Sequence, residues 1–423
     1  MKRILVHIPM QPHGEYDIFS PYDEHAMIEL VNRDLCGNAP NFGNRLWFQG
    51  LISAIACEEN HLEYFSPDMT KEQINNEYDF IIAPMANVFS VHYRDLLKRL
   101  ENRFRGIKIP VYVIACGIQA DSFDQLDELV SALKEPASGF ISSVYNTGGE
   151  FALRGHFTKE FFEKLGFPSA VATGCPSLFQ MGRNLSISDE KVPESQFRPL
   201  FNGSINDYLE LYKQYERSEF FDQNMYFREL FDLKGKNQQL LKQMIQSHGM
   251  DATKLILQDR VRLIPHMNLW RENLRQAGFS FSYGSRIHGS IMPILSGICT
   301  VLEHRDARTR EMAEFFNIPH VEPNGYRSYD SLYQLYQQAS YKAFNEGFAT
   351  RFDAYEQFLV RCGIVEKINQ NNRFFYSVDE MQAIGNTQEK RQELVCLLQK
   401  KRTYWNGYAF LMNTKRKLRS CLR

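Results

Sequence analysis

Several features that would identify a class of protein are scarce or missing in this 423-residue sequence. The eight cysteines include no CxxC pair, and most lie in apolar runs such as residues 113–116. We interpret them as buried, reduced thiols rather than as a disulfide framework or a zinc site. No stretch approaches the roughly 18 consecutive apolar residues of a membrane-spanning helix, and the apolar run after Arg3 is too short for a signal peptide. We therefore predict a cytoplasmic protein.

An excess of charge of one sign, internal repeats and metal-binding motifs are also lacking. The formal net charge is −1, which excludes a global basic field for nucleic acid, so no nucleic-acid partner is predicted. The absence of repeats excludes solenoids and propellers. No DxD or HExxH motif occurs, and we expect that neither a metal nor a bound cofactor is required.

The pattern that is present predicts an α/β fold. Short apolar runs alternate with amphipathic stretches, which is typical of βαβ units and a parallel sheet. Strands are predicted at residues 3–8, 78–83, 110–115, 151–154 and 170–173, and again at 254–257, 279–283, 300–303 and 319–322. Helices are predicted at residues 45–57, 261–276, 290–295 and 308–316.

The length of the chain is too great for one ordinary core, so we predict two Rossmann-like lobes and an extension. The N-terminal lobe is predicted at residues 1–190 and the C-terminal lobe at residues 195–330, with a linker rich in Ser, Glu, Asp and Pro around residues 186–199. Residues 331–423 are predicted to form a helical extension that ends in a basic tail.

The tail differs in composition from the rest of the chain. From Lys400 onward there are eight basic residues and no acidic one, and an apolar patch at residues 404–412 separates two basic clusters. This combination suits the surface of an anionic membrane, on the inner face of which the protein would be peripheral. A solvated or partner-docked tail is the alternative.

Ligands of parallel α/β sheets bind at the carboxyl ends of strands, so residues that follow strands directly are candidate site residues. The polar glycine turn at residues 41–45, with Asn41 and Asn44, opens a helix, although such turns are often purely structural. Arg154 ends an apolar strand, where its guanidinium could clamp a carboxylate or phosphate. A structural ion pair is the alternative for Arg154.

Two further segments follow strands in the second predicted lobe. After the strand at 279–283, Ser285, Arg286, His288 and Gly289 form a turn into a helix, whose amide groups would point at an anion. After the strand at 300–303 comes a loop with three arginines and a histidine within seven residues, which looks able to receive an anion, although part of it could be solvated helix surface. Its members are His304, Arg305, Arg308 and Arg310.

Taken together, these segments resemble the polysaccharide pyruvyl transferase family over residues 41–320. The resemblance rests on Arg154-Gly155 with the following helix, on residues 174–178 (GCPSL), on residues 285–289 (SRIHG), and on the loop at residues 306–308 before a helix. It implies a two-lobed fold similar to GT-B glycosyltransferases. It also implies transfer of pyruvate from phosphoenolpyruvate to a sugar hydroxyl pair, which forms a cyclic ketal in capsule, exopolysaccharide or cell-wall synthesis.

The sequence departs from the family pattern at three positions. Asn44 stands where the family usually has aspartate in Asn-x-Gly-Asp, and Cys175 stands where Gly-Asp-Pro is frequent. Arg308 occupies a position where lysine is common. Arginine keeps the positive charge, but its planar guanidinium binds phosphate as a fork of N–H groups, whereas the lysine ammonium is a point charge. The first two changes concern the acceptor sugar more than the donor.

The leading hypothesis is therefore a pyruvyl transferase that uses phosphoenolpyruvate as co-substrate and a sugar or lipid-linked oligosaccharide as acceptor. His288, Arg154 and Arg308 are predicted to be catalytic, His288 as the proton-transfer residue and the two arginines as donor clamps. Substrate-binding roles are predicted for Arg286, Ser285, Gly289, Asn41 and Asn44. The donor site is predicted in the C-terminal lobe and the acceptor site in the N-terminal lobe. A GT-B glycosyltransferase that uses a nucleotide sugar, or a non-catalytic glycan-binding subunit, is the alternative.

Overall fold

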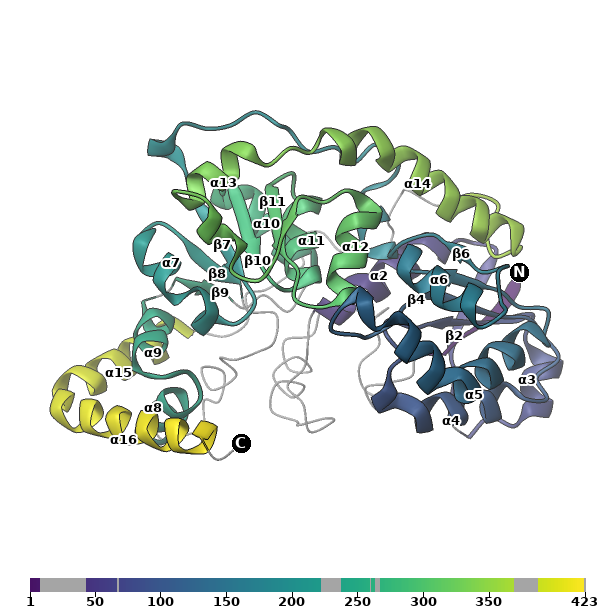
Figure 1. The fold of residues 1–423 in the computed structure, drawn as a ribbon, viewed down its shortest axis with the longest axis horizontal. Helices are drawn as coiled ribbons and strands as arrows, with labels where there is room; N and C mark the ends of the chain where they lie inside the picture. The colour runs from purple at the N-terminus through teal and green to yellow at the C-terminus, as the bar shows by residue number, and fades with distance from the viewer. Residues whose placement is uncertain are drawn as a thin grey trace. The chain divides into compact units, whose positions relative to one another are not determined.

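Two six-stranded parallel sheets form the framework of the protein (Figure 1). A computed structural model describes residues 1–7, 43–66, 68–221, 237–258, 260–262, 267–368 and 387–421. Helices connect and cover the strands of each sheet. The prediction of an α/β fold with two Rossmann-like lobes and a helical C-terminal region is confirmed.

The first sheet has the strand order β2-β1-β3-β4-β5-β6. Its strands are β1 (Lys2–Val6), β2 (Asn60–Tyr64), β3 (Phe80–Pro84), β4 (Val111–Cys116), β5 (Phe151–Leu153) and β6 (Val171–Ala172). The central strands β3 and β4 are buried along their whole length, as expected of parallel strands covered on both faces. Because such strands are continuous apolar runs, both could be predicted from the sequence.

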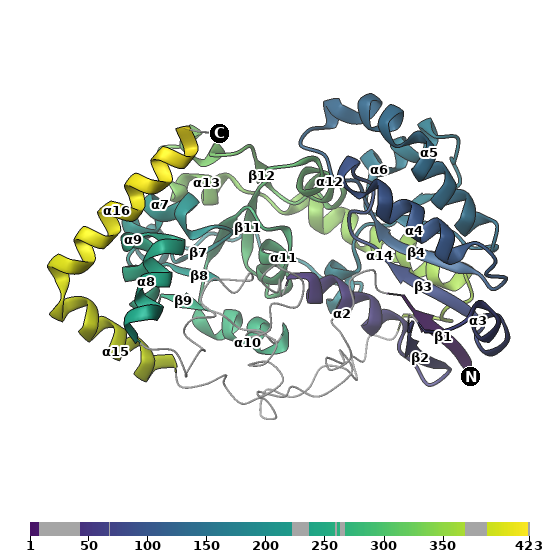
Figure 2. The same ribbon diagram turned by 90° about the horizontal axis from the view of Figure 1, so that it is seen from below.

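The helices of the first sheet are α2 (Gly43–Ile55), α3 (Lys71–Glu77), α4 (Arg94–Phe104), α5 (Leu126–Tyr145) and α6 (His156–Lys164). The two helices α4 and α5 run side by side against one face of the sheet (Figure 2). Leu97 and Phe104 of α4 and Leu133 and Phe140 of α5 bury their side chains in one core with strand residues such as Val113.

The second sheet has the order β12-β11-β10-β7-β8-β9. Its strands are β7 (Pro199–Asn202), β8 (Glu219–Phe221), β9 (Val261–Arg262), β10 (Phe281–Gly284), β11 (Cys299–Glu303) and β12 (His320–Val321). The helices that alternate with these strands along the chain are α7 (Leu209–Gln214), α8 (Asn237–His248), α9 (Met250–Leu257), α10 (Met267–Ala277), α11 (Ile287–Leu295) and α12 (Ala307–Phe316). The C-terminal helices are α13 (Leu332–Gln338), α14 (Lys342–Arg361), α15 (Thr387–Lys400) and α16 (Arg402–Cys421).

By their packing, the described residues divide into two compact units. One contains residues 1–7, 46–191 and 299–368, and the other contains residues 43–45, 192–298 and 387–421, apart from the positions without description. The loop before α12 and the turn after β5 therefore lie in the same unit. The binding of acceptor and donor by separate lobes stays a prediction.

Three predicted elements are wrong in type or extent. Residues 254–257 are the end of α9 rather than a strand. The short apolar run at residues 255–257 favours a strand in the sequence, although Asp251, Lys254 and Gln258 are exposed at helical spacing. Residues 261–276 do not form one helix, since β9 occupies the first two positions and α10 begins at Met267. Helix α11 begins at Ile287, three residues before the predicted start at Ser290.

Within the described ranges, no helix has the length and apolar character needed to cross a bilayer.

Candidate active site

Arg154 follows the last residue of β5 and is almost completely enclosed. Its backbone N–H donates to the carbonyl oxygen of Cys116 on β4 (2.8 Å), which extends the sheet by one residue. The side chain is only 1% exposed, and its Nε and Nη2 atoms have no hydrogen-bond partner in the described part of the chain. A buried guanidinium with unused donors is costly unless an anion satisfies them, so Arg154 is suited to receive a carboxylate or phosphate.

The turn after Arg154 depends on a carboxylate from another helix. Gly155 is the N-cap residue of α6 and has no side chain to cap the helix. Glu311 of α12 supplies the cap instead, because its Oε1 accepts from the backbone N–H of Thr158 (2.6 Å) and its Oε2 accepts from the Thr158 hydroxyl (2.9 Å). A Cβ at position 155 would lie 2.5 Å from Cγ of Glu311, so glycine is required by this close approach.

Glu311 is itself fully buried, and its protonation is finely balanced. Burial raises the pKa of its carboxyl to about 7, although the two hydrogen bonds from Thr158 and the charge of Arg154 favour the ionised form. The carboxyl can therefore change its charge near neutral pH, next to the arginine with the unused donors.

Arg308 adds a second cation beside Arg154. It lies in the first turn of α12, after Asp306, which caps the helix through Thr309 (Oδ1 to N, 2.7 Å). Arg308 donates from Nη2 to Asp306 (3.2 Å), and its buried Nε has no hydrogen-bond partner among the described residues. Burial, together with the nearby charge of Arg308, lowers the pKa of Arg154. The structure thus brings together the two arginines that the sequence predicts as anion clamps.

Asp306 does not cancel this positive charge. Burial opposes its ionisation, but the charge of Arg308 and the hydrogen bonds from Thr309 hold the pKa of Asp306 below its ordinary value. One ionised carboxylate therefore faces Arg308, while the carboxyl near Arg154 among the described residues is the titrating one of Glu311. The cluster retains positive charge for an anionic ligand.

The turn at residues 174–178 packs against the same helix. Gly174 has φ +83°, and a Cβ there would lie 2.5 Å from the ring of Phe316 on α12. Cys175 is buried and accepts a hydrogen bond from the hydroxyl of Ser177 (3.1 Å). Since the family pattern often has an aspartate here, the cysteine removes a carboxylate that could have paired with Arg154.

The second group of predicted residues lies in the other unit, at the turn from β10 to α11. His288 is buried at the second position of α11, and Arg286 is the N-cap residue. Asn202, at the end of β7, accepts from the backbone N–H of Arg286 (3.0 Å) and donates to the hydroxyl of Ser290 (3.3 Å). Asn202 therefore fixes the turn that carries the histidine.

The two glycines of this turn are explained by the same asparagine. A Cβ at Gly284 would lie 2.1 Å from the carbonyl oxygen of Asn202, and one at Gly289 would lie 2.9 Å from its side chain. Sequence reasoning missed Asn202 because β7 was not predicted. The apolar run that ends in Asn202-Gly203, with Gly203 at φ +122°, was the available signal.

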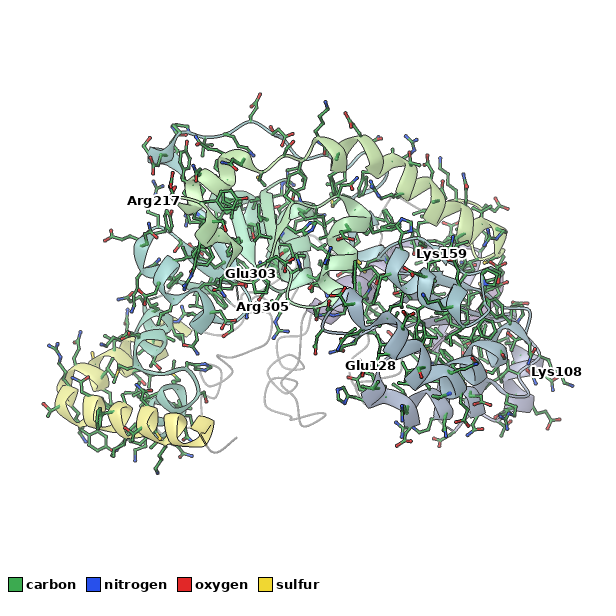
Figure 3. All side chains as sticks on the ribbon, in the orientation of Figure 1. Lys108, Glu128, Lys159, Arg217, Glu303 and Arg305 are labelled. Atoms are coloured by element: carbon green, nitrogen blue, oxygen red, sulfur yellow. The ribbon has the colours of Figure 1, made fainter. Side chains whose placement is uncertain are left out.

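The remaining predicted site residues have mixed outcomes. Arg305 donates to Glu303 (2.6 Å), and both residues are labelled in Figure 3. Arg310 donates to Glu314 (2.7 Å), so these arginines form local ion pairs. Asn41 lies outside the described residues, and Asn44 is described only as backbone in α2. Arg154 and Arg308 come together in one unit, whereas Ser285, Arg286, His288 and Gly289 form their turn in the other.

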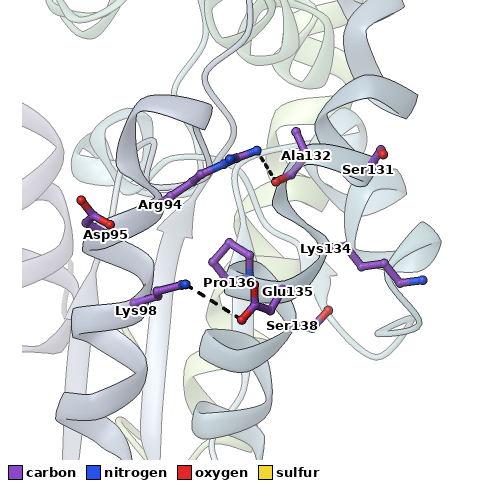
Figure 4. Close-up of a pocket in the computed structure, with 9 residues that line it drawn as sticks. All are labelled: Arg94, Asp95, Lys98, Ser131, Ala132, Lys134, Glu135, Pro136 and Ser138. Atoms are coloured by element: carbon purple, nitrogen blue, oxygen red, sulfur yellow. Dashed lines mark hydrogen bonds and ion pairs between the residues drawn. The ribbon is translucent and has the colours of Figure 1, made fainter.

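A groove of about 630 Å³ between α4 and α5 contains none of these residues (Figure 4). Two of its three cations already have partners, since Arg94 donates to the carbonyl oxygen of Ala132 and Lys98 pairs with Glu135. It is therefore not a candidate site. In the described ranges, no group of three or more His, Cys, Asp or Glu side chains could hold a metal ion.

Comparison with known proteins gives one family and several distant folds. The sequence profile described as polysaccharide pyruvyl transferase matches residues 14–302. No curated protein matches the sequence.

Three solved structures illustrate the distant folds. MnaA of S. aureus with UDP is 10% identical, over 87% of this chain and 99% of that one, at a TM-score of 0.42. UDP-GlcNAc 2-epimerase of Neisseria meningitidis is 12% identical (85% and 100%, TM-score 0.40). The glycosyltransferase SnogD of Streptomyces nogalater is 11% identical (94% and 99%, TM-score 0.30). Likenesses this distant say nothing about substrate or mechanism.

The contact between Gly155 and Glu311 predicts that Gly155→Ala is destabilising. The added methyl group would push Glu311 away from Thr158, at an expected cost of about 1–3 kcal/mol in the free energy of unfolding. Gly407→Ala in α16 is the control, because a Cβ there meets nothing within 4 Å. Chemical denaturation measures both, and equal stability of Gly155→Ala and the unmodified protein would contradict the capping role of Glu311.

The raised pKa of Glu311 predicts a specific pH dependence of stability. Between about pH 5 and pH 7 the folded carboxyl keeps a proton that the unfolded one releases, since the pKa is about 7 when folded and 4.5 ordinarily. The unfolded state then binds fewer protons, so this contribution to stability is lost as pH rises, by up to about 3 kcal/mol. Glu311→Gln keeps one acceptor oxygen for Thr158 and cannot ionise. The difference in unfolding free energy between the two proteins should therefore change over this range, and a constant difference would contradict the assignment.

Proposed function

Because the chain belongs to the polysaccharide pyruvyl transferase family, we propose that it transfers pyruvate from phosphoenolpyruvate to two hydroxyl groups of a sugar. The product is a cyclic ketal on a bacterial surface polysaccharide, such as a capsule or exopolysaccharide, and inorganic phosphate is released. The reaction takes place in the cytoplasm, on a free or lipid-linked acceptor. We expect that no metal ion or other cofactor takes part.

The buried, unsatisfied Arg154 is the observation that carries this proposal. Phosphoenolpyruvate has a carboxylate and a phosphate on a three-carbon frame, so its site must supply several fixed cations within a small space. Arg154 offers two unused donor atoms, and Arg308 places a second charge nearby at the start of α12. The N-terminus of that helix adds a partial positive charge of its own.

The chemistry also needs proton transfer. A proton is delivered to the methylene carbon of the donor, which makes the adjacent carbon electrophilic. The two sugar hydroxyls attack that carbon, two C–O bonds form and the C–O bond to phosphate breaks. One of the two hydroxyl protons makes up for the proton delivered to the new methyl group, and the other leaves with the phosphate. His288 is the group proposed for these transfers, since imidazole gains and loses protons near neutral pH.

The turn around His288 supports that role. Asn202 holds the backbone of Arg286, so the histidine stands on a fixed turn next to a cation and at the start of a helix. Such rigid placement is what positioned acid–base catalysis requires. The variants below test the arginines and His288 separately.

The clamp role predicts that Arg308→Ala weakens phosphoenolpyruvate binding by about tenfold or more, because a charge-assisted hydrogen bond is lost. Arg310→Ala is the matched control, since Arg310 lies two residues further along α12 and pairs with Glu314. Calorimetric titration with phosphoenolpyruvate measures both affinities. Titration with a UDP-sugar tests the alternative, and tight binding of the UDP-sugar without binding of phosphoenolpyruvate would indicate a glycosyltransferase.

The proton-transfer role predicts that His288→Ala lowers turnover by about 10²–10⁴-fold while donor affinity changes little. Phosphate release in the presence of acceptor measures turnover, and calorimetry on the same preparation measures affinity. Near-normal turnover of His288→Ala would show that another group moves the proton.

A further inference from the structure

The C-terminal helix α16 is a docked element of the second unit, rather than a free tail. It lies against α8 and α15 (Figures 1 and 2). Trp405 is fully buried, and its indole Nε1 donates to the carbonyl oxygen of Leu397 on α15 (3.2 Å). Ala409, one turn further on, is also buried. One side of the helix is thereby fixed to the protein.

The opposite side of α16 carries large apolar side chains that nothing in the described structure covers. Phe410 is 72% exposed, Leu411 57% and Tyr404 45%. Tyr404 and Leu411 are seven residues apart, which places them on the same face after two helical turns. Apart from Met1 at the chain start, Phe410 and Leu411 are the most exposed large apolar residues described. Their concentration on one helix marks an interaction surface.

The segment that carries this surface has charges of positive sign only. Residues 400–423 contain eight Lys and Arg residues and no acidic residue. Since the whole chain carries −1 and this segment +8, the other 399 residues together carry −9. A negatively charged surface would therefore attract this end of the protein and repel the remainder, which fixes the orientation of approach.

We propose that the exposed face of α16 docks on an anionic lipid bilayer. The helix lies in the plane of the interface, with Phe410, Leu411 and Tyr404 among the acyl chains. The exposed Lys401, Arg402 and Lys415 lie at the headgroups. Anionic lipid is favoured over nucleic acid because leucine at the centre of the face needs an apolar phase and has no ring to stack on bases. The proposal is independent of the reaction that the protein catalyses.

Vesicle sedimentation of the full chain tests this surface. Vesicles of phosphatidylglycerol mixed with phosphatidylcholine should bind the protein, whereas pure phosphatidylcholine should not. Binding to the anionic vesicles should fall sharply when salt rises from about 0.1 M to about 1 M, since the Debye length shrinks from ~10 Å to ~3 Å.

Two pairs of variants separate the contributions of charge and apolar surface. Lys401→Glu with Lys415→Glu should weaken binding at least about 25-fold, because each basic residue near such a surface contributes about fivefold. Lys108→Glu with Lys134→Glu is the matched control, since both are exposed lysines of the other unit. The Phe410→Ser, Leu411→Ser double variant should weaken vesicle binding at least tenfold. The Val91→Ser, Val360→Ser double variant is its control, since both valines are exposed elsewhere on the protein.

The outcomes are distinct because all these side chains are exposed and the variants should keep the unfolding temperature of the unmodified protein. Docking through this face is supported if both variants of the α16 segment lose vesicle binding and both control variants keep it. Equal binding to neutral vesicles, equal losses in the control variants, or no binding at all would overturn it. The Phe410→Ser, Leu411→Ser double variant could also bind the anionic vesicles unchanged, with inorganic polyphosphate releasing it as readily as the unmodified protein. That result would show a site for soluble polyanions instead.

Discussion

The carboxyl group of Glu311 is the contact on which the arrangement of the candidate site depends. It caps the N-terminus of α6 through Thr158 and lies over Gly155 so closely that no side chain fits there. It thereby ties α12 to the turn that follows β5. Because Arg154 precedes that turn and Arg308 begins α12, the same contact sets two guanidinium groups near each other. Loss of this contact would therefore loosen the turn and the spacing of the two cations together.

The second unit repeats this principle with a neutral residue. Asn202 holds the turn between β10 and α11 from a neighbouring strand, and glycines at positions 284 and 289 give it room. In both units a polar side chain from another element fixes a strand-to-helix turn, and the turn presents a basic or titratable residue. An anionic ligand suits such turns because the helix N-termini add their own positive potential.

The sequence allowed prediction of the parts that depend on local pattern. Strands β3 and β4 are continuous apolar runs, and Arg154, Arg308 and His288 stand directly after strands. The role of Glu311 could not be predicted, since it arises from a contact with Thr158 far away in the chain, and Asn202 was missed together with β7. Helix α9 was mistaken for a strand because the short apolar run at residues 255–257 is compatible with either element, and periodicity alone does not separate them. The sequence pattern thus identifies the residues that a turn presents, whereas tertiary packing determines which residues hold the turn in place.

The central claim is that Arg154 and Arg308 receive phosphoenolpyruvate. A crystal structure of the protein soaked with phosphoenolpyruvate tests it most directly. The account predicts a carboxylate or phosphate oxygen of the donor at about 2.7–2.9 Å from Nε or Nη2 of Arg154, with Arg308 in contact with the same molecule. Donor bound elsewhere, with Arg154 still unpartnered, would contradict it.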